Sequence, residues 1–470
     1  MIKRTIAELA MMCGGEPNAA AEAERDRTVN GVATDSRGLT EGRLFVPLTG
    51  ERFDGHEYVE SCFGRGAALA LWSQDRPVPE QLAQRPLLIV RDTLEALQKL
   101  ARAYRLELQV KVVGITGSNG KTTTKDLTAA VLAAAYRVHK TEGNLNNHIG
   151  LPLTILRMDE DAECAVLEMG MSGFGEIELL AAIALPDIAV VTNIGDAHLL
   201  QLGSREGIAK AKLEIASGLR PGGTILINGD EPLLTVGIRD AKLSEGADVQ
   251  TFGLGEGHDW SAGSIAVGAK ESAFTVKADG STARLGGAFK IPVPGRHNVS
   301  NALAAVAVGA LLGLTDDQIR SGLSGAKLTG MRIETVTAHN GATILNDAYN
   351  ANPTAVRAAI ALVAELTGFG RKWLVLADML ELGPEEEKLH YDTGAAISPD
   401  TVDRVLTFGT LARHIAEGAS AGLGAERVVH FDGKAELAAY LREHVAADDL
   451  VLVKGSRGMR MEEIVQFMAR

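Results

Sequence analysis

The chain has 470 residues, of which 46% are hydrophobic and 23% charged, and its formal net charge at pH 7 is −13. This length is enough for about three domains, each with its own core. The acidic balance argues against a nucleic-acid partner or an anionic membrane, because either would require a basic face.

The three cysteines, Cys13, Cys62 and Cys164, lie far apart and form no C-x-x-C pair, so the sequence indicates neither a disulfide framework nor a zinc site. The first ten residues predict an amphipathic helix and lack the apolar region of a signal peptide. No apolar run reaches 18 residues. We therefore expect a cytoplasmic protein without stable membrane insertion, with a monomer as the default state.

Residues 1–108 predict a small α/β domain, with a helix near 5–13 and strands near 31–34, 43–47, 67–72 and 86–90. Ser36, Arg37 and Arg52 lie near tight turns in this domain. Arginine and serine side chains around a turn can bind a diphosphate through charge-assisted hydrogen bonds. The same residues also suit a solvated surface turn, so both interpretations stay open.

A helix over 93–108 leads into V-V-G-I-T-G-S-N-G-K-T-T-T-K-D at 112–126, which predicts a strand, a glycine-rich turn and a helix. This is the pattern of a phosphate-binding loop, in which backbone N–H groups surround the phosphates. Lys121 would reach the β- and γ-phosphates, and the Thr122 hydroxyl could bind Mg²⁺. The match is imperfect, since Ile115 stands where the pattern has its first glycine.

Residues 109–328 alternate strands and helices, which predicts a mostly parallel sheet covered on both faces. Glu168 ends one apolar strand, and Asp196 and His198 follow another. Ligands bind at the carboxyl ends of parallel strands, so we expect Glu168 and His198 to lie near the phosphate loop. The loop T-E-G-N-L-N-N-H-I-G-L-P at 141–152 has enough hydrogen-bonding side chains to indicate a ligand contact as well.

A later helix carries Lys210 and Lys212, which lie two residues apart and therefore on different faces, so only one of them can point at the site. Asn298 lies near the start of another helix and could be its cap or could recognise a base.

Residues 329–470 predict a third, Rossmann-like unit with strands near 343–346, 373–377, 402–408 and 449–453. No G-x-G-x-x-G follows its first strand, so a nicotinamide or flavin cofactor is not implied. Polar segments end its strands, among them N-D-A-Y-N-A-N-P at 346–353 and V-K-G-S-R-G at 453–458. A phosphate loop, metal-binding side chains and two polar flanking domains together suit phosphoryl transfer to a substrate brought in by domain closure.

Eight motifs together make the chain resemble the Mur ligase family of ATP-dependent peptidoglycan-precursor amide ligases. They are G-I-T-G-S-N-G-K-T-T, T-E-G-N-L-N-N-H-I-G-L-P, L-E-M-G, N-I-G-D-A-H-L, A-K-L-E-I, G-R-H-N-V-S-N-A-L-A-A, G-M-R-I-E and N-D-A-Y-N-A-N-P. The resemblance covers essentially the whole chain. It implies an α/β protein of three domains: a UDP-binding domain at 1–108, a central ATP-binding domain at 109–328 and a Rossmann-like ligase domain at 329–470.

The segments T-D-S-R, M-G-M-S-G-F-G-E-I and K-G-S-R-G-M-R-M-E-E-I look like those of the family member that acts last in the cytoplasm. That resemblance implies UDP-N-acetylmuramoyl-tripeptide and D-alanyl-D-alanine as substrates, with ATP and Mg²⁺. Another Mur ligase is one alternative. Folylpolyglutamate synthetase is a second with similar chemistry, although it ordinarily lacks the domain before the phosphate loop. A non-catalytic nucleotide switch is an alternative of another class.

The resemblance also assigns residues. Lys121, His198 and Lys212 would be catalytic, and Thr122, Glu168, His198 and Lys212 would hold Mg²⁺, with Lys212 as the family's carbamylated lysine. A free lysine would repel Mg²⁺, whereas a carbamate is an anion. ATP would be bound by Gly117, Ser118, Asn119, Gly120, Lys121, Thr122, Thr123, Asn298, Arg332 and Asp347. The substrates would be bound by Ser36, Arg37, Arg52, Asn146, Asn147, His148, Tyr349, Asn350, Asn352, Lys454, Ser456 and Arg457.

Overall fold

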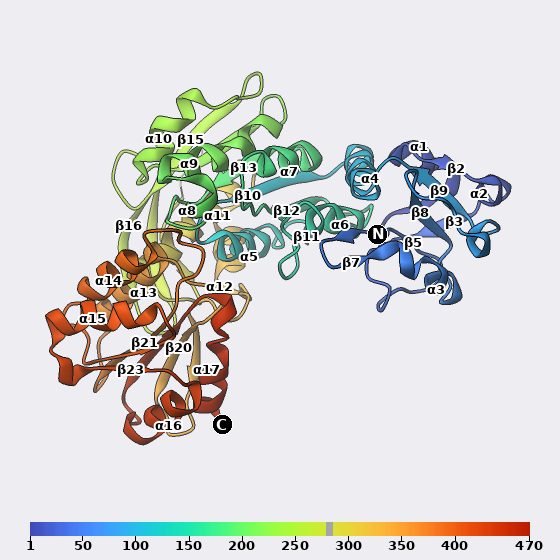
Figure 1. Cartoon of the computed structure of the whole chain (residues 1–470). Coiled ribbons are helices and arrows are strands. Elements are labelled where there is room, and N and C mark those ends of the chain that lie inside the picture. Colours follow the sequence, from blue (N-terminus) through green and yellow to red (C-terminus); the bar gives the residue numbers. More distant parts are fainter. Residues whose placement is uncertain (279–284) are drawn as a thin grey trace.

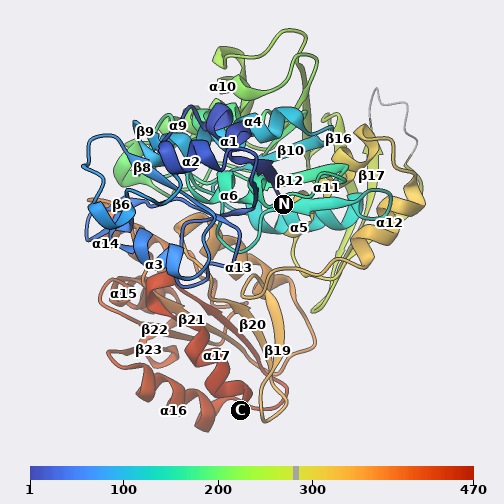
Figure 2. The same cartoon turned by 90° about the vertical axis from the view of Figure 1, so that its right-hand side faces the viewer.

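Three large β-sheets, of five, nine and six strands, give the chain three lobes (Figure 1). The structure is a computed structural model that describes residues 1–278 and 285–470. The N-terminal lobe, in blue, stands beside the central lobe, and the C-terminal lobe, in orange and red, lies below the central lobe in both views (Figures 1 and 2). The three-domain α/β architecture predicted from the sequence is confirmed.

The N-terminal lobe contains the predicted helix and all four predicted strands. Its five-stranded sheet has the order β2-β9-β8-β5-β4, in which β9, β8, β5 and β4 run parallel. A capping box between Thr5 and Glu8 starts the first helix. The elements are β1 Lys3–Thr5, α1 Ile6–Cys13, β2 Glu16–Pro17, α2 Ala19–Ala23, β3 Thr28–Asn30, β4 Val32–Ala33, β5 Leu44–Phe45, β6 Thr49–Gly50, β7 Phe53–Asp54, α3 Val59–Gly64, β8 Leu69–Ser73 and β9 Leu87–Val90.

The helix α4 (Thr93–Glu107) connects this lobe to the central sheet, as predicted, and packs against α6 and α7 of the central lobe. The central sheet has the order β11-β12-β10-β13-β14-β15-β16-β17-β18, and all pairings except the last two are parallel. Its strands are β10 Lys111–Thr116, β11 Val138–Lys140, β12 Cys164–Glu168, β13 Ile188–Val191, β14 Thr224–Asn228, β15 Asp248–Gly253, β16 Trp260–Val267, β17 Ser272–Ala278 and β18 Ala288–Ile291.

The central helix α11 (Arg296–Leu311) is buried around most of its circumference, because alanine and valine residues let α5 and α12 approach it closely. The other central helices are α5 Lys121–Leu132, α6 Gly150–Leu156, α7 Glu176–Ala184, α8 Leu199–Leu202, α9 Arg205–Leu213, α10 Pro232–Gly237 and α12 Asp316–Ser324.

The C-terminal sheet has the order β19-β20-β24-β21-β22-β23, with only β19 antiparallel to its neighbour. The four strands predicted in this unit are present, and β19 and β23 extend its two edges. The strands are β19 Glu334–Thr337, β20 Thr343–Asp347, β21 Lys372–Ala377, β22 Arg404–Phe408, β23 Val428–Phe431 and β24 Leu450–Lys454; the helices are α13 Pro353–Glu365, α14 Glu386–Ala395, α15 Ala412–Leu423, α16 Lys434–His444 and α17 Glu462–Ala469.

Buried apolar side chains join neighbouring lobes. One cluster combines Ile115 and Val299 of the central lobe with Val356 of the C-terminal lobe, and another combines Leu97 of α4 with Leu167 of the central sheet. The central and C-terminal lobes therefore share one buried apolar cluster. In the described part of the chain, no helix combines the length and the apolar character needed to cross a membrane.

The carboxylate of Asp449, only 1% exposed, fixes the start of β24 against β21. It accepts hydrogen bonds from the Arg371 backbone N–H, the Trp373 indole and the Ala446 backbone N–H, each at 2.9 Å. We expect Asp449→Ala to lower the free energy of unfolding by about 3–5 kcal/mol, because several buried donors lose their acceptor. Asp448→Ala, at the exposed neighbouring position, should change it little; equal losses in denaturant unfolding would contradict this role for Asp449.

Candidate functional site

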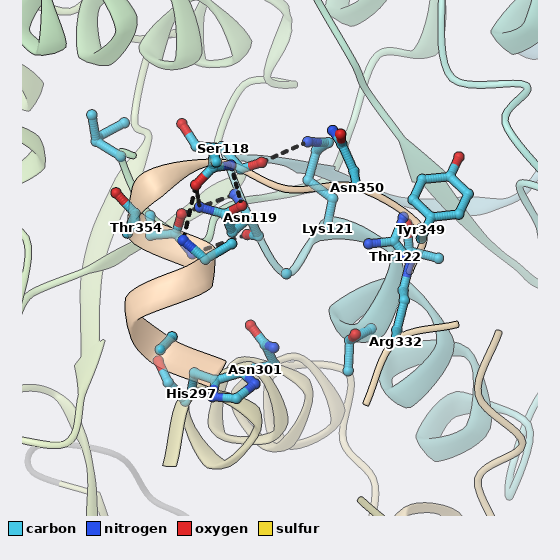
Figure 3. Close-up of a pocket in the computed structure, with 18 of the residues that line it drawn as sticks. Ser118, Asn119, Lys121, Thr122, His297, Asn301, Arg332, Tyr349, Asn350 and Thr354 are labelled. Atoms are coloured by element: carbon cyan, nitrogen blue, oxygen red, sulfur yellow. Dashed lines mark hydrogen bonds between the residues drawn. The ribbon is translucent and has the colours of Figure 1, made fainter. Parts of the chain in front are cut away.

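A cavity of about 820 Å³ lies between the central and C-terminal lobes. The carboxyl ends of β10, β12 and β13 open into it, since Ile115 of β10 pairs with Glu168 of β12 and with Val190 of β13. Residues that follow β20 and β24 line its other side. Phosphate-loop residues therefore face side chains of the C-terminal lobe (Figure 3).

The loop between β10 and α5 is shaped by two glycines with positive φ, Gly117 at 146° and Gly120 at 80°. A Cβ on Gly117 would lie 1.9 Å from the Thr192 hydroxyl oxygen, and one on Gly120 would lie 2.4 Å from the Asn301 side-chain oxygen. Ile115, where the phosphate-loop pattern has a glycine, is instead a fully buried residue of β10. The departure from the pattern thus falls in the strand and leaves the turn unchanged.

Lys121 begins α5, and its ammonium group donates to the Gly117 carbonyl oxygen at 2.7 Å. It also donates to the Ser118 carbonyl oxygen at 3.2 Å (Figure 3). Burial lowers the pKa of Lys121, and Arg332 adds to this effect while Glu168 opposes it. The lysine therefore lies inside the loop, with its charge available for an anion.

Glu168 is 3% exposed and lies beside the first turn of α5. The Thr122 hydroxyl donates to it at 2.9 Å, and the Asn146 amide at 2.8 Å. The described residues contain no group of three or more His, Cys, Asp or Glu side chains placed to hold a metal ion. Mg²⁺ is usually bound by one or two carboxylates together with substrate phosphates and water, so Thr122 and Glu168 fit such an ion.

His198 follows β13 and adopts a left-handed backbone conformation with φ of 63°. Its Nδ1 is buried without a hydrogen bond, and the nearest carboxylate oxygen, of Glu381, is 3.5 Å away. Burial, together with the charges of Lys212 and Lys121, lowers the pKa of His198 to about 4. The imidazole is therefore neutral near pH 7 and has a free nitrogen lone pair for a ligand.

Lys212 is 1% exposed on the inner face of α9, whereas Lys210 is exposed. Burial lowers the pKa of Lys212 well below its usual value, and the charge of Lys121 lowers it further. Lys212 is not among the residues that line the cavity, but its charge when protonated helps to lower the pKa of His198. An uncharged amine at this position is a nucleophile.

The C-terminal lobe adds its own charged groups. The Arg332 guanidinium lies over the Tyr349 ring, 4.1 Å from its centroid, and the Lys454 ammonium contacts Asp347 at 2.5 Å and the Asn350 carbonyl oxygen at 2.9 Å. These five residues all line the cavity.

Two side-chain pairs connect the lobes across the cavity. Asn352 donates to the side chain of the phosphate-loop residue Asn119 at 2.7 Å and also caps α13. The Thr354 hydroxyl donates to Asp196 at 2.7 Å. The phosphate loop is thus in direct contact with the start of a C-terminal helix.

Asn298 lines the cavity but is not the N-cap of α11, a place taken by Gly295. Its amide donates to the Pro294 carbonyl oxygen at 2.8 Å, and its side-chain oxygen accepts from Asn301. The sequence interpretation did not single out His297 and Asn301, although both line the cavity and lie within the G-R-H-N-V-S-N motif. Thr354 was also missed, one helical position beyond N-A-N-P.

Several predicted residues lie outside the cavity lining. Arg37 is exposed and pairs with its neighbour Asp35, Arg52 is exposed, and Arg457 pairs with Glu462 at 2.9 Å. The Ser456 hydroxyl accepts from the Leu380 backbone N–H. The predicted residues that line the cavity are Ser118, Asn119, Gly120, Lys121, Thr122, Thr123, Asn146, Asn147, Glu168, His198, Asn298, Arg332, Asp347, Tyr349, Asn350, Asn352 and Lys454; those that do not are Gly117, Lys212, Ser36, Arg37, Arg52, His148, Ser456 and Arg457.

Comparisons with protein families match most of the chain. The Mur ligase middle domain matches residues 115–309, the Mur ligase glutamate ligase domain matches 331–457, and the Mur ligase family catalytic domain matches 28–105.

Individual relatives match over the full length. The UDP-N-acetylmuramoyl-tripeptide--D-alanyl-D-alanine ligase of Bacillus subtilis is 50% identical, over 99% of this chain and 98% of the relative. Among solved structures, MurF from Acinetobacter baumannii superposes with a TM-score of 0.88 at 30% identity, over 100% of both chains. MurF from Thermotoga maritima in complex with ADP has a TM-score of 0.81 at 28% identity, over 94% of this chain and 97% of that one.

The lack of room for a Cβ at Gly120, beside the Asn301 side chain, gives a test of the loop geometry. We expect Gly120→Ala to weaken ADP binding by at least about tenfold, since the loop must shift and lose charge-assisted hydrogen bonds. Gly313→Ala is the matched control, because Gly313 has a similar φ of 82° but nothing within 4 Å of its Cβ position. It should cost about 1–2 kcal/mol of stability from backbone strain without changing ADP affinity. Equal ADP affinity of both variants in calorimetric titration would refute the loop assignment.

Proposed function

The chain belongs to the Mur ligase family, and from this premise we propose that it joins D-alanyl-D-alanine to the C-terminal carboxylate of UDP-N-acetylmuramoyl-tripeptide, using ATP. The observation that carries the proposal is the cavity in which the phosphate loop of the central lobe faces Asp347, Tyr349 and Lys454 of the C-terminal lobe. Such a site can hold a nucleoside triphosphate and the carboxylate of the tripeptide together. The enzyme is an amide ligase of peptidoglycan synthesis, which we place in the cytoplasm as a monomer.

The chemistry requires activation of the carboxylate, because an amine cannot displace oxide from it. The γ-phosphoryl group of ATP is transferred to the tripeptide carboxylate, which gives an acyl phosphate and ADP. The free amine of D-alanyl-D-alanine then attacks the acyl carbon, and phosphate leaves. In this sequence the protein mainly aligns the reactants and neutralises charge.

Residues of the central lobe bind the triphosphate. Lys121 and the backbone N–H groups of residues 117–123 hold the phosphates, with Ser118 and Asn119 at the turn. Thr122 and Glu168 would hold Mg²⁺, which would neutralise the negative charge that develops on the phosphates. Neutral His198 can contribute a nitrogen ligand nearby.

Lys212 is the proposed carbamylated residue. Burial lowers its pKa and so increases the fraction of neutral amine, the form that can attack CO₂ to give a carbamate with release of one proton. The product is an anion beside Lys121, where the unmodified ammonium would be repelled.

The remaining assignments follow the family. Asn298 would recognise the adenine, and Arg332 and Asp347 would reach ATP from the C-terminal lobe. We assign the lobes to residues 1–108, 109–328 and 329–470, with the UDP end of the substrate on the first. Ser36, Arg37, Arg52, Asn146, Asn147 and His148 would hold the UDP-sugar, and Tyr349, Asn350, Asn352, Lys454, Ser456 and Arg457 the peptide and dipeptide.

The function is tested by product analysis. With ATP and Mg²⁺, we expect phosphate release only when both a UDP-muramoyl tripeptide and D-alanyl-D-alanine are present, and mass spectrometry should find the pentapeptide product. Variation of the third residue of the tripeptide and of the dipeptide defines the specificity. Phosphate release that is independent of both substrates would favour a nucleotide switch instead.

Lys212→Ala should abolish ligation, and a small carboxylate such as formate should restore part of it by replacing the carbamate. Lys210→Ala is the matched control on the exposed face of α9 and should retain activity. Full activity of Lys212→Ala in the phosphate-release assay would remove this assignment.

A further inference from the structure

Asp126 is a buried carboxylate on α5 that does not line the cavity. One of its oxygens accepts two hydrogen bonds from Thr329, at 2.8 Å from the backbone N–H and at 2.7 Å from the hydroxyl. The other oxygen contacts the ammonium groups of Lys140 at 3.0 Å and Lys125 at 3.2 Å. Burial acts to raise the pKa of Asp126, but Lys125 and the Thr329 donors hold it below its usual value. The carboxylate is therefore charged, and both of its oxygens have hydrogen-bond or ion-pair partners.

Thr329 lies in the segment that joins α12 to β19, and thus the central lobe to the C-terminal lobe. Arg332 follows three residues later and lines the cavity. Met331 and Ile333, on either side of Arg332, have backbone φ angles of 62° and 55°, which residues other than glycine rarely adopt. Such strain persists only where the surroundings hold the backbone in place.

Contacts hold this segment at both ends. On the central side, Thr329 is fixed by Asp126. On the C-terminal side, Glu334 accepts hydrogen bonds from the Met331 backbone N–H at 3.0 Å and from the Asn346 amide at 3.1 Å. Between these anchors the chain presents Arg332 over the Tyr349 ring.

We propose that Asp126 is a positioning residue, which acts through Thr329 to set the place of Arg332 at the nucleotide. It couples the helix that begins at the phosphate loop with the arginine that enters from the other lobe. The inference rests on the proposed contact of Arg332 with ATP. The proposal adds that α5, the helix that follows the phosphate loop, controls the position of Arg332 through Thr329.

The test uses Thr329, because replacing Asp126 would leave the buried Lys125 without its counter-ion. Thr329→Val removes the hydroxyl donor and keeps the shape, and Thr329→Ala removes the same donor if the valine variant does not fold. Thr329→Ser restores the hydroxyl. The matched control is Thr335→Val in β19, since the Thr335 hydroxyl donates to the Ala269 carbonyl oxygen, away from Asp126.

We expect Thr329→Val to weaken binding of a non-hydrolysable ATP analogue by about tenfold, the effect of one hydrogen bond to a charged group, and to raise KM for ATP more than it lowers kcat. Thr329→Ser and Thr335→Val should stay within about twofold of the unaltered protein. On an Arg332→Ala background, Thr329→Val should add less than about twofold, because both substitutions then act on one contact.

Additive losses in the double variant, or equal losses in Thr329→Val and Thr335→Val, would overturn the positioning role, as would unchanged affinity in Thr329→Val. The single variant Arg332→Ala separately tests the proposed contact of Arg332 with ATP, on which the inference rests. If Arg332→Ala alone leaves the analogue's affinity unchanged, Arg332 does not contact ATP, and the inference falls with that assignment.

Discussion

The parallel pairing of β10 with both β12 and β13 is the constraint on which the site depends. This pairing ends three strands at one edge of the central sheet, and each delivers one polar group there: Lys121 after β10, Glu168 at the end of β12 and His198 after β13. A shift of β12 by one residue would turn Glu168 to the opposite face of the sheet, away from the Thr122 hydroxyl. The apolar residues that fix this register are therefore as necessary to the site as its polar residues.

The convergence has an electrostatic consequence. Lys121, Lys212 and His198 lie close enough that the charge of each lysine lowers the pKa of at least one neighbour, and Glu168 is the buried carboxylate among them. Positively charged side chains that are shielded from water stabilise a bound anion more strongly than exposed ones do. A bound triphosphate would supply negative charge here, and the proposed carbamate on Lys212 would put an anion in place of a group that is cationic when protonated. The same desolvation lowers the pKa of Lys212 and so increases the neutral fraction of its amine, the form that would react with CO₂ in the proposed carbamylation.

The sequence predicted the elements that carry strong local signals. Apolar strands followed by glycine turns identified β10, β12, β13 and the main C-terminal strands, and the fold class and family were confirmed. The edge strands β2 and β19 were missed, because β2 has only two residues, including Pro17, and β19 (E-T-V-T) is short and polar. Burial of Lys212 and the contacts of Thr354 and Asp126 depend on packing between distant segments, which periodicity along one helix does not report.

The connection between the lobes explains why a site of two halves can act as one. The cavity alone would let the C-terminal groups move independently of the phosphate loop. Instead, Asn119 contacts Asn352 at the start of α13, Asp196 contacts Thr354 two residues later, and one buried apolar cluster contains residues of both lobes. In the part of the chain that the structure describes, no hydrogen bond or ion pair joins the N-terminal lobe to the C-terminal lobe, and the N-terminal lobe stands on the far side of α4 and α6 from it (Figure 1). Under the proposed assignment of the UDP end to this lobe, the substrate would have to extend to the cavity, which would place its terminal carboxylate, and not its nucleotide, beside the phosphates of ATP.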